Sequence, residues 1–108
     1  MAKEKILDLS LTYHWYDIID SGVKKEEYRD IKKQFYISRL LKNKKITSTN
    51  EFRHYDFVRF HRGQGGKTNM LVECCGIQIG QGKPEWGAVP GETYFIIKLG
   101  KILQKNEC

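Results

Sequence analysis

Long hydrophobic runs are absent from this sequence, and that absence sets the first limit on its class. No window approaches the roughly 18 to 20 uncharged apolar residues that a membrane-spanning helix needs. The opening stretch, MAKEKILDLS, has no apolar segment of signal-peptide length before charges intervene. We therefore expect no membrane association, and we predict a cytoplasmic location.

Cysteine is scarce, and its three positions form neither a disulfide framework nor a metal-binding pair. Cys74 and Cys75 are neighbours in an apolar run, and Cys108 is the last residue. We interpret the first two as reduced thiols that serve as small buried hydrophobic side chains. The three histidines share no ligand-like spacing with one another or with the cysteines. The sequence thus predicts no metal site and no cofactor.

Signatures of nucleophilic and phosphate-transfer enzymes are also missing. No serine stands in a nucleophile-elbow pattern. The segment HRGQGGKTN, residues 61–69, lacks the glycine spacing of a P-loop, so nucleoside triphosphate hydrolysis has no support. The simpler interpretation of this segment is a loop that connects two strands of a hairpin. The alternative is a phosphate contact made by backbone amides together with His61, Arg62 and Lys67.

Positive charge is what the sequence has in excess. Nineteen Lys and Arg against thirteen Asp and Glu give a net charge of +6, and seven of the lysines lie between residues 24 and 45. This balance favours a polyanionic partner without identifying it. With 108 residues, the chain has the size of one ordinary domain, and we assign residues 1–108 to a single domain without repeats or linkers.

The first half of the chain predicts strands that alternate with helices. Leu7, Leu9 and Leu11 alternate with polar residues, which is typical of a half-buried strand. Thr12 can cap the helix that follows, and Gly22 can end it, because glycine adopts the left-handed conformation without a clash. The expected elements are a strand over 5–11, a helix over 13–21, an edge strand over 24–29 and a helix over 31–45.

The second half predicts consecutive strands over 55–62, 68–80 and 94–104. Gly76 is expected to mark a bulge, and Gly100 a possible break in the last strand. Helices early and strands late favour an α+β fold with a mostly antiparallel sheet that curls into a small barrel, flanked by two or three helices.

The charge run SGVKKEEYRD, residues 21–30, allows two interpretations. In a strand, Glu27 and Arg29 lie on one face, while Lys24 and Tyr28 lie on the other together with Glu26. The first interpretation directs Tyr28 into the core and leaves the charges to protect an exposed edge from pairing.

The second interpretation makes the same run a binding site. Lys24, Glu27 and Arg29 could share a cleft next to the first helix. A carboxylate accepts hydrogen bonds from amino groups and a guanidinium forks onto phosphate oxygens, so this set suits a nucleotide.

A resemblance favours the binding site. The spacing G-x-K-x-x-E-x-R, formed by Gly22, Lys24, Glu27 and Arg29, resembles the signature of the ASCH domain family, whose fold is similar to the PUA β-barrel. The segments YHWYDIIDSG, YDFVRFHRGQG, PEWGAVPGE and YFIIKLGKIL follow in the order of that family. The resemblance covers nearly the whole chain. It implies a PUA-like barrel of about five or six strands and a cleft for RNA or a nucleotide-like ligand between the first helix and the barrel.

One branch of this family removes the acyl group from N4-acetylcytidine with a lysine, a threonine and a later glutamate. Lys24 matches that lysine, whereas Glu27 stands where that branch has its threonine. Glu73, a charge in an otherwise apolar strand, could supply the glutamate if it faces inward toward Lys24. Otherwise Glu73 lies on the outer face of the sheet.

Two tryptophans complete the candidates. Trp15 falls on the apolar face of the first helix and is expected in the core, whereas Trp86, in a Gly/Pro loop, either caps the barrel or stacks on a base.

The leading hypothesis is an RNA- or modified-nucleotide-binding domain that uses Lys24, Glu27 and Arg29. Hydrolysis of an N4-acylated cytidine or a similar amide by Lys24 and Glu73 is the alternative. The second alternative is a protein-interaction domain without a small-molecule site. The sequence does not predict an oligomeric state.

Overall fold

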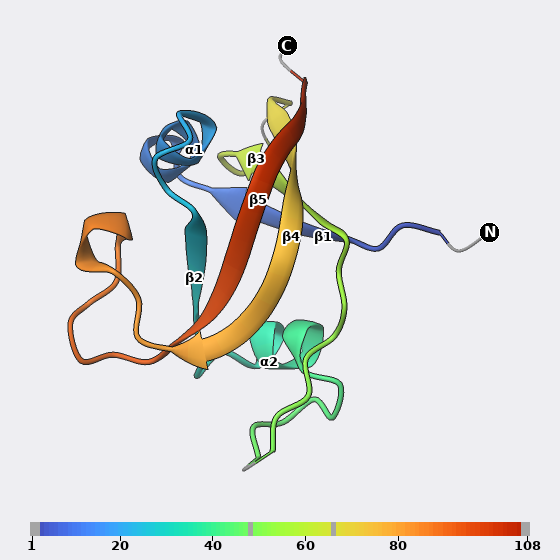
Figure 1. The fold of residues 1–108 in the computed structure, drawn as a ribbon, viewed down its shortest axis with the longest axis vertical. Coiled ribbons are helices and arrows are strands. Elements are labelled where there is room, and N and C mark those ends of the chain that lie inside the picture. The colour runs from blue at the N-terminus through green and yellow to red at the C-terminus, as the bar shows by residue number, and fades with distance from the viewer. Residues whose placement is uncertain (1–2, 48, 66, 107–108) are drawn as a thin grey trace.

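Strands and helices alternate in the first half of the chain, and strands follow one another in the second half, in the predicted order (Figure 1). The computed structural model describes residues 3–47, 49–65 and 67–106. Its elements are β1 (Ile6–Leu11), α1 (Tyr13–Asp20), β2 (Glu26–Asp30), α2 (Gln34–Leu40), β3 (Phe57–Arg62), β4 (Asn69–Gly80), the short 3-10 helix η1 (Pro84–Trp86) and β5 (Tyr94–Asn106).

All five strands belong to one sheet with the order β1-β3-β4-β5-β2. β1 pairs with β3 in parallel, and the other neighbours are antiparallel. The sheet curls into a half-barrel that leaves β1 and β2 as its two edges, while α1 and α2 lie at opposite ends (Figure 1). The structure thus confirms the predicted α+β fold with a mostly antiparallel, barrel-like sheet.

The core fills the concave side of the sheet with alternate residues of each strand. Leu7, Leu9 and Leu11 of β1 are buried, as their period of two predicted, and α1 adds Tyr16 and Ile19. The remaining buried members of this cluster are Leu40, Leu41, Val58, Phe60, Met70, Val72, Phe95, Ile97 and Leu99. Glu27 of β2 pairs with Ile97, so the inner face of this edge strand borders the core.

Glycines shape the two long strands. Gly76 has φ of 137° at a register shift between β4 and β5, which confirms the predicted bulge. The expected break at Gly100 is wrong, because β5 runs through this position without interruption. A Cβ on Gly100 would lie 2.8 Å from Glu73 Oε1 and 2.9 Å from Cys75 Sγ, so glycine admits these side chains against the strand.

Local details differ from the predictions in two places. Helix α2 spans Gln34–Leu40 only, because Leu41 turns to an extended conformation and forms a bridge with Phe52. Thr12 precedes α1 with extended dihedrals, as expected of a cap, but its side chain makes no capping hydrogen bond. Gly22 adopts φ of 85° directly after the helix, as predicted.

Cys74 and Cys75 are free thiols in different surroundings. Cys74 packs against the core, and its burial raises the pKa of its thiol. Cys75 is exposed, so the prediction of burial is wrong for this residue, which lies on the opposite face of β4. Cys108 lies outside the described residues. Among the helices that the structure describes, none combines the length and apolarity needed to cross a membrane.

Candidate ligand-binding cleft

The opening between β1 and β2 contains a cavity of about 400 Å³, hereafter the cleft. Its walls come from the end of β1, the start of α1, the edge strand β2 and the start of α2. The lining residues are Ser10, Leu11, Thr12, Trp15, Glu27, Tyr28, Arg29, Asp30, Lys33 and Tyr36. Glu27 and Arg29 of the charged motif singled out in the sequence therefore line a hollow of ligand size, and Lys24 is not among the lining residues.

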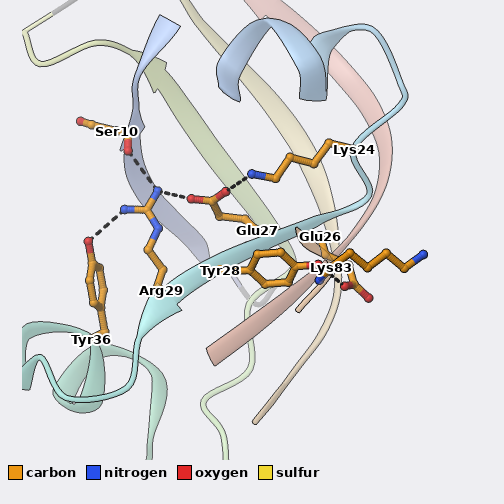
Figure 2. A network of polar contacts seen from close by, with 8 residues as sticks. All are labelled: Ser10, Lys24, Glu26, Glu27, Tyr28, Arg29, Tyr36 and Lys83. Atoms are coloured by element: carbon orange, nitrogen blue, oxygen red, sulfur yellow. Dashed lines mark hydrogen bonds and ion pairs between the residues drawn. The ribbon is translucent and has the colours of Figure 1, made fainter. Parts of the chain in front are cut away.

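Glu27 is the centre of a buried ionic network in this cleft (Figure 2). Its Oε1 accepts from Lys24 Nζ at 2.9 Å, and its Oε2 pairs with Arg29 Nη2 at 2.7 Å. The side chains of Lys24, Glu27 and Arg29 are only 3%, 7% and 12% exposed. An ionised carboxylate is costly to bury alone, so the two flanking cations are what make its burial tolerable.

Arg29 joins the two edges of the half-barrel (Figure 2). Its Nη2 donates to the Ser10 carbonyl of β1 at 3.0 Å, and its Nη1 donates to the Tyr36 hydroxyl of α2 at 2.9 Å. These bonds fix the plane of the guanidinium between β1, β2 and α2. A preoriented guanidinium can present its remaining donors to an anion without losing further side-chain freedom.

Lys24 contacts the cleft residue Glu27 from the segment between α1 and β2. Because the strand begins only at Glu26, the alternation of faces does not apply to Lys24. Lys24 contacts Glu27, so their separation on opposite faces of a strand is wrong, whereas the second interpretation expected them together. The Lys24 ammonium also lies 4.2 Å from the centre of the Trp15 ring. Trp15 is half-buried and packs against the core, but it also lines the cleft.

Tyr28 lies on the opposite face of β2 and does not enter the core. Its hydroxyl donates to Glu26 Oε1 at 2.7 Å and accepts from the Lys83 amide at 2.9 Å, which fastens the β4–β5 loop to β2 (Figure 2). Burial, helped by the neighbouring Glu26 carboxylate, raises the pKa of Tyr28 to about 12. The interpretation of this run as a protected edge with a core tyrosine is therefore wrong in its geometry, since Glu27 is the buried residue.

The network carries an unbalanced charge. Lys24 and Arg29 contribute two positive charges and Glu27 one negative charge, so the three side chains together carry one positive charge. Asp30 and Lys33 add one charge of each sign to the cleft lining. Arg29 Nε is buried and donates to no group of the described protein. A buried donor without an acceptor costs about 1 to 3 kcal/mol and calls for an explanation. The net positive charge fits a site that accepts an anionic ligand, whereas the buried Nε atom is closed to solvent.

Glu73 is not brought together with Lys24. Its Oε1 accepts from the Lys101 backbone amide at 2.9 Å, on the outer face of the sheet beside Gly100. The second of the two predicted placements, on the outer face, is therefore the one observed. Lys24 is paired with Glu27 instead.

Arg62 also lies apart from the residues that line the cleft. It forms two hydrogen bonds to Asp17 at 3.0 and 3.1 Å, and its guanidinium lies 4.2 Å from the centre of the Tyr13 ring. The hydrogen bond from Arg62 lowers the pKa of Asp17. Arg62 thus joins the end of β3 to α1.

The other predicted contacts are on separate loops. Lys67 is exposed beside the β3–β4 turn, where its carbonyl accepts from Asn69. Trp86 is half-buried in η1 with Lys83 Nζ 4.4 Å from its ring centre. The next residue, Gly87, packs closely on Trp15, so this loop abuts α1.

Ser10, Tyr36 and Lys33 are cleft residues that sequence reasoning missed. Ser10 contributes a backbone carbonyl, for which no side-chain pattern exists. Tyr36 falls within the helix predicted over 31–45, and its contact with Arg29 across the β2–α2 turn depends on the fold. Among the described residues, no three histidine, cysteine or acidic side chains gather as metal ligands.

Comparisons with protein-family models, with curated proteins and with solved structures find no match to this chain. The resemblance to the ASCH family therefore stays a prediction, and the cleft has to be interpreted from its own chemistry.

Proposed function

We propose that this protein binds single-stranded RNA or a modified nucleotide in the cleft between β1 and β2. The observation that carries the proposal is the buried Lys24–Glu27–Arg29 network, which carries one net positive charge and whose Glu27 and Arg29 line a cavity of about 400 Å³. Arg29 would meet a phosphate, and the carboxylate of Glu27 would accept from the amino group of a base.

Aromatic and basic groups around the network support the same ligand class. Trp15 and Tyr36 supply ring surfaces on which bases stack, and Lys33 adds a positive charge at the cleft wall. The excess of basic residues in the whole chain favours association with a polyanion. A cytoplasmic setting, in keeping with the free thiols, is part of this proposal.

Amide hydrolysis receives no such support. The predicted partners Lys24 and Glu73 are engaged elsewhere, by Glu27 and by the Lys101 amide. Release of acetate from N4-acetylcytidine would nevertheless establish it, so that compound belongs among the probes.

The test is a titration of isotope-labelled protein, followed by NMR, with short single-stranded RNA, with nucleoside monophosphates and with N4-acetylcytidine. We expect RNA or a nucleotide to shift the amide signals of Trp15 and residues 26–30 without release of acetate. An absence of shifts with every probe would overturn the proposal and favour a protein-interaction domain.

A pair of arginine variants makes the test specific. Arg29→Lys keeps the charge but removes the guanidinium fork, and we expect RNA affinity to fall by about tenfold or more. Arg62→Lys alters an arginine that is paired outside the cleft, so it serves as the matched control. Equal losses in both variants would contradict the placement of the ligand in the cleft.

A further inference from the structure

A second cavity lies against the cleft. It has a volume of about 300 Å³ and is lined by Asp8, Leu9, Ser10, Arg29, Phe35, Tyr36 and Gln64. Ser10, Arg29 and Tyr36 line both cavities. These are the same three residues that hydrogen-bond to one another through the Arg29 guanidinium. The two cavities therefore meet at the one cation that joins β1, β2 and α2.

Each cavity has its own aromatic ring. Trp15 lines the cleft, and Phe35 lines the second cavity. Phe35 is 54% exposed, although it is a large apolar side chain, and it contacts Tyr36 edge to face. An aromatic ring at a cavity wall offers a stacking surface for a base, whichever base is present. Phe35 is the exposed ring of the two, with the Arg39 guanidinium 4.7 Å from its ring centre, whereas Trp15 is half-buried with the Lys24 ammonium over its ring.

Across the two cavities, a cation therefore lies between two rings, and in a nucleotide chain a charged phosphate likewise lies between two bases. We propose that the site holds two consecutive nucleotides and that the phosphodiester between them lies at Arg29 and Tyr36. One nucleoside occupies the cleft beside Trp15, and the next occupies the cavity beside Phe35. This inference rests on the proposed function and narrows its ligand to an oligonucleotide.

Polar groups in the second cavity fit the second nucleoside. Asp8 lines this cavity, and its exposed carboxylate lies 2.9 Å from the His61 ring nitrogen. Gln64 is exposed and carries both a donor and an acceptor. Ribose hydroxyls and base edges would form hydrogen bonds with this carboxylate and this amide, whereas the phosphate would pair with Arg29.

The experiment compares ribodinucleoside monophosphates with the matching nucleoside monophosphates, using calorimetry and the amide signals of Trp15, Phe35 and Tyr36. We expect the dinucleoside compounds to bind about tenfold or more tightly, because the second nucleoside binds as an intramolecular step. They should shift Phe35 and Tyr36 as well as Trp15. Equal affinity and no shift at Phe35 would overturn the two-nucleotide site but leave a single-nucleotide cleft intact. Binding by neither class would overturn the proposed function as well.

Variants of the exposed rings separate the two cavities. Phe35→Ala should abolish the roughly tenfold advantage of the dinucleoside compounds over the mononucleotides. Leu103→Ala is the matched control, because Leu103 is 48% exposed on β5 and lines neither cavity. An unchanged preference for dinucleoside compounds in Phe35→Ala would overturn the assignment of Phe35 to the second nucleoside.

Discussion

At the scale of single residues, Glu27 decides whether two cations can remain buried. Its two carboxylate oxygens are divided between Lys24 and Arg29, and all three side chains are nearly inaccessible to water. Removal of the carboxylate charge leaves two buried positive charges in contact with a neutral group. The stability of the edge strand and the binding chemistry therefore depend on the same residue.

We expect Glu27→Gln to lower the free energy of unfolding by about 3 to 5 kcal/mol, the usual cost of breaking a buried ion pair from one side. Urea denaturation followed by circular dichroism measures this change. Glu51→Gln is the control, because Glu51 meets Lys42 at 3.8 Å on the exposed surface, where such a pair contributes about 0 to 1 kcal/mol. Similar losses in both variants would contradict a buried network.

Tyr28 makes stability depend on pH in the alkaline range. Its folded-state pKa is raised to about 12 by burial and by Glu26, above the ordinary value of 10.0. The unfolded state therefore loses this proton first, and the stabilising contribution, complete below about pH 10, is lost as the pH rises through 12. Chemical denaturation across this range should show a steeper decline for the wild type than for Tyr28→Phe. Parallel declines would show that Tyr28 is not the group responsible.

At the scale of elements, the β4–β5 loop is fitted onto β2. The Tyr28 hydroxyl accepts from the Lys83 amide, and the ring lies directly against Gly82. A Cβ at Gly82 would come within 2.6 to 2.7 Å of three ring atoms. Gly82 is thus required for close packing of the loop on the strand that carries Glu27 and Arg29.

Gly82→Ala should therefore destabilise the protein by about 1 to 3 kcal/mol, as overpacking usually does. Thermal unfolding of Gly82→Ala and Gly80→Ala gives the comparison. Gly80 stands at the end of β4, where a Cβ would meet Ile96 at an ordinary 3.4 Å. The prediction fails if both variants unfold at the same temperature.

Elements governed by local periodicity could be predicted from the sequence, and elements governed by tertiary packing could not. Alternating leucines predicted β1, and Gly22 predicted the end of α1, because both signals are local. The end of α2 at Leu40 was missed, because it depends on a bridge between Leu41 and Phe52. The motif predicted Lys24, Glu27 and Arg29 together, whereas Tyr36 joins them only through the fold.

At the scale of the whole molecule, the open half-barrel explains why a cleft lies beside the buried charged cluster. The sheet order leaves β1 and β2 without a common ladder among the described residues, and Arg29 crosses the opening instead. Sequence patterns predicted strands and their curl, but whether the curl closes depends on strand order and register, which the sequence does not express locally. The cleft follows from that incomplete closure.

The net charge of +6 should make RNA binding depend on salt, because each contacted phosphate releases counterions. For single strands, the logarithm of the affinity falls with the logarithm of salt concentration by about 0.7 per contact. Lys33 lines the cleft and is exposed, so Lys33→Ala should weaken binding of short single-stranded RNA and reduce this slope by about 0.7. Fluorescence anisotropy at several salt concentrations measures both effects. Lys101→Ala is the control, because Lys101 is exposed on β5 away from the cleft lining. An equal change of slope in both variants would mean that the phosphates contact the surface at large and not the cleft.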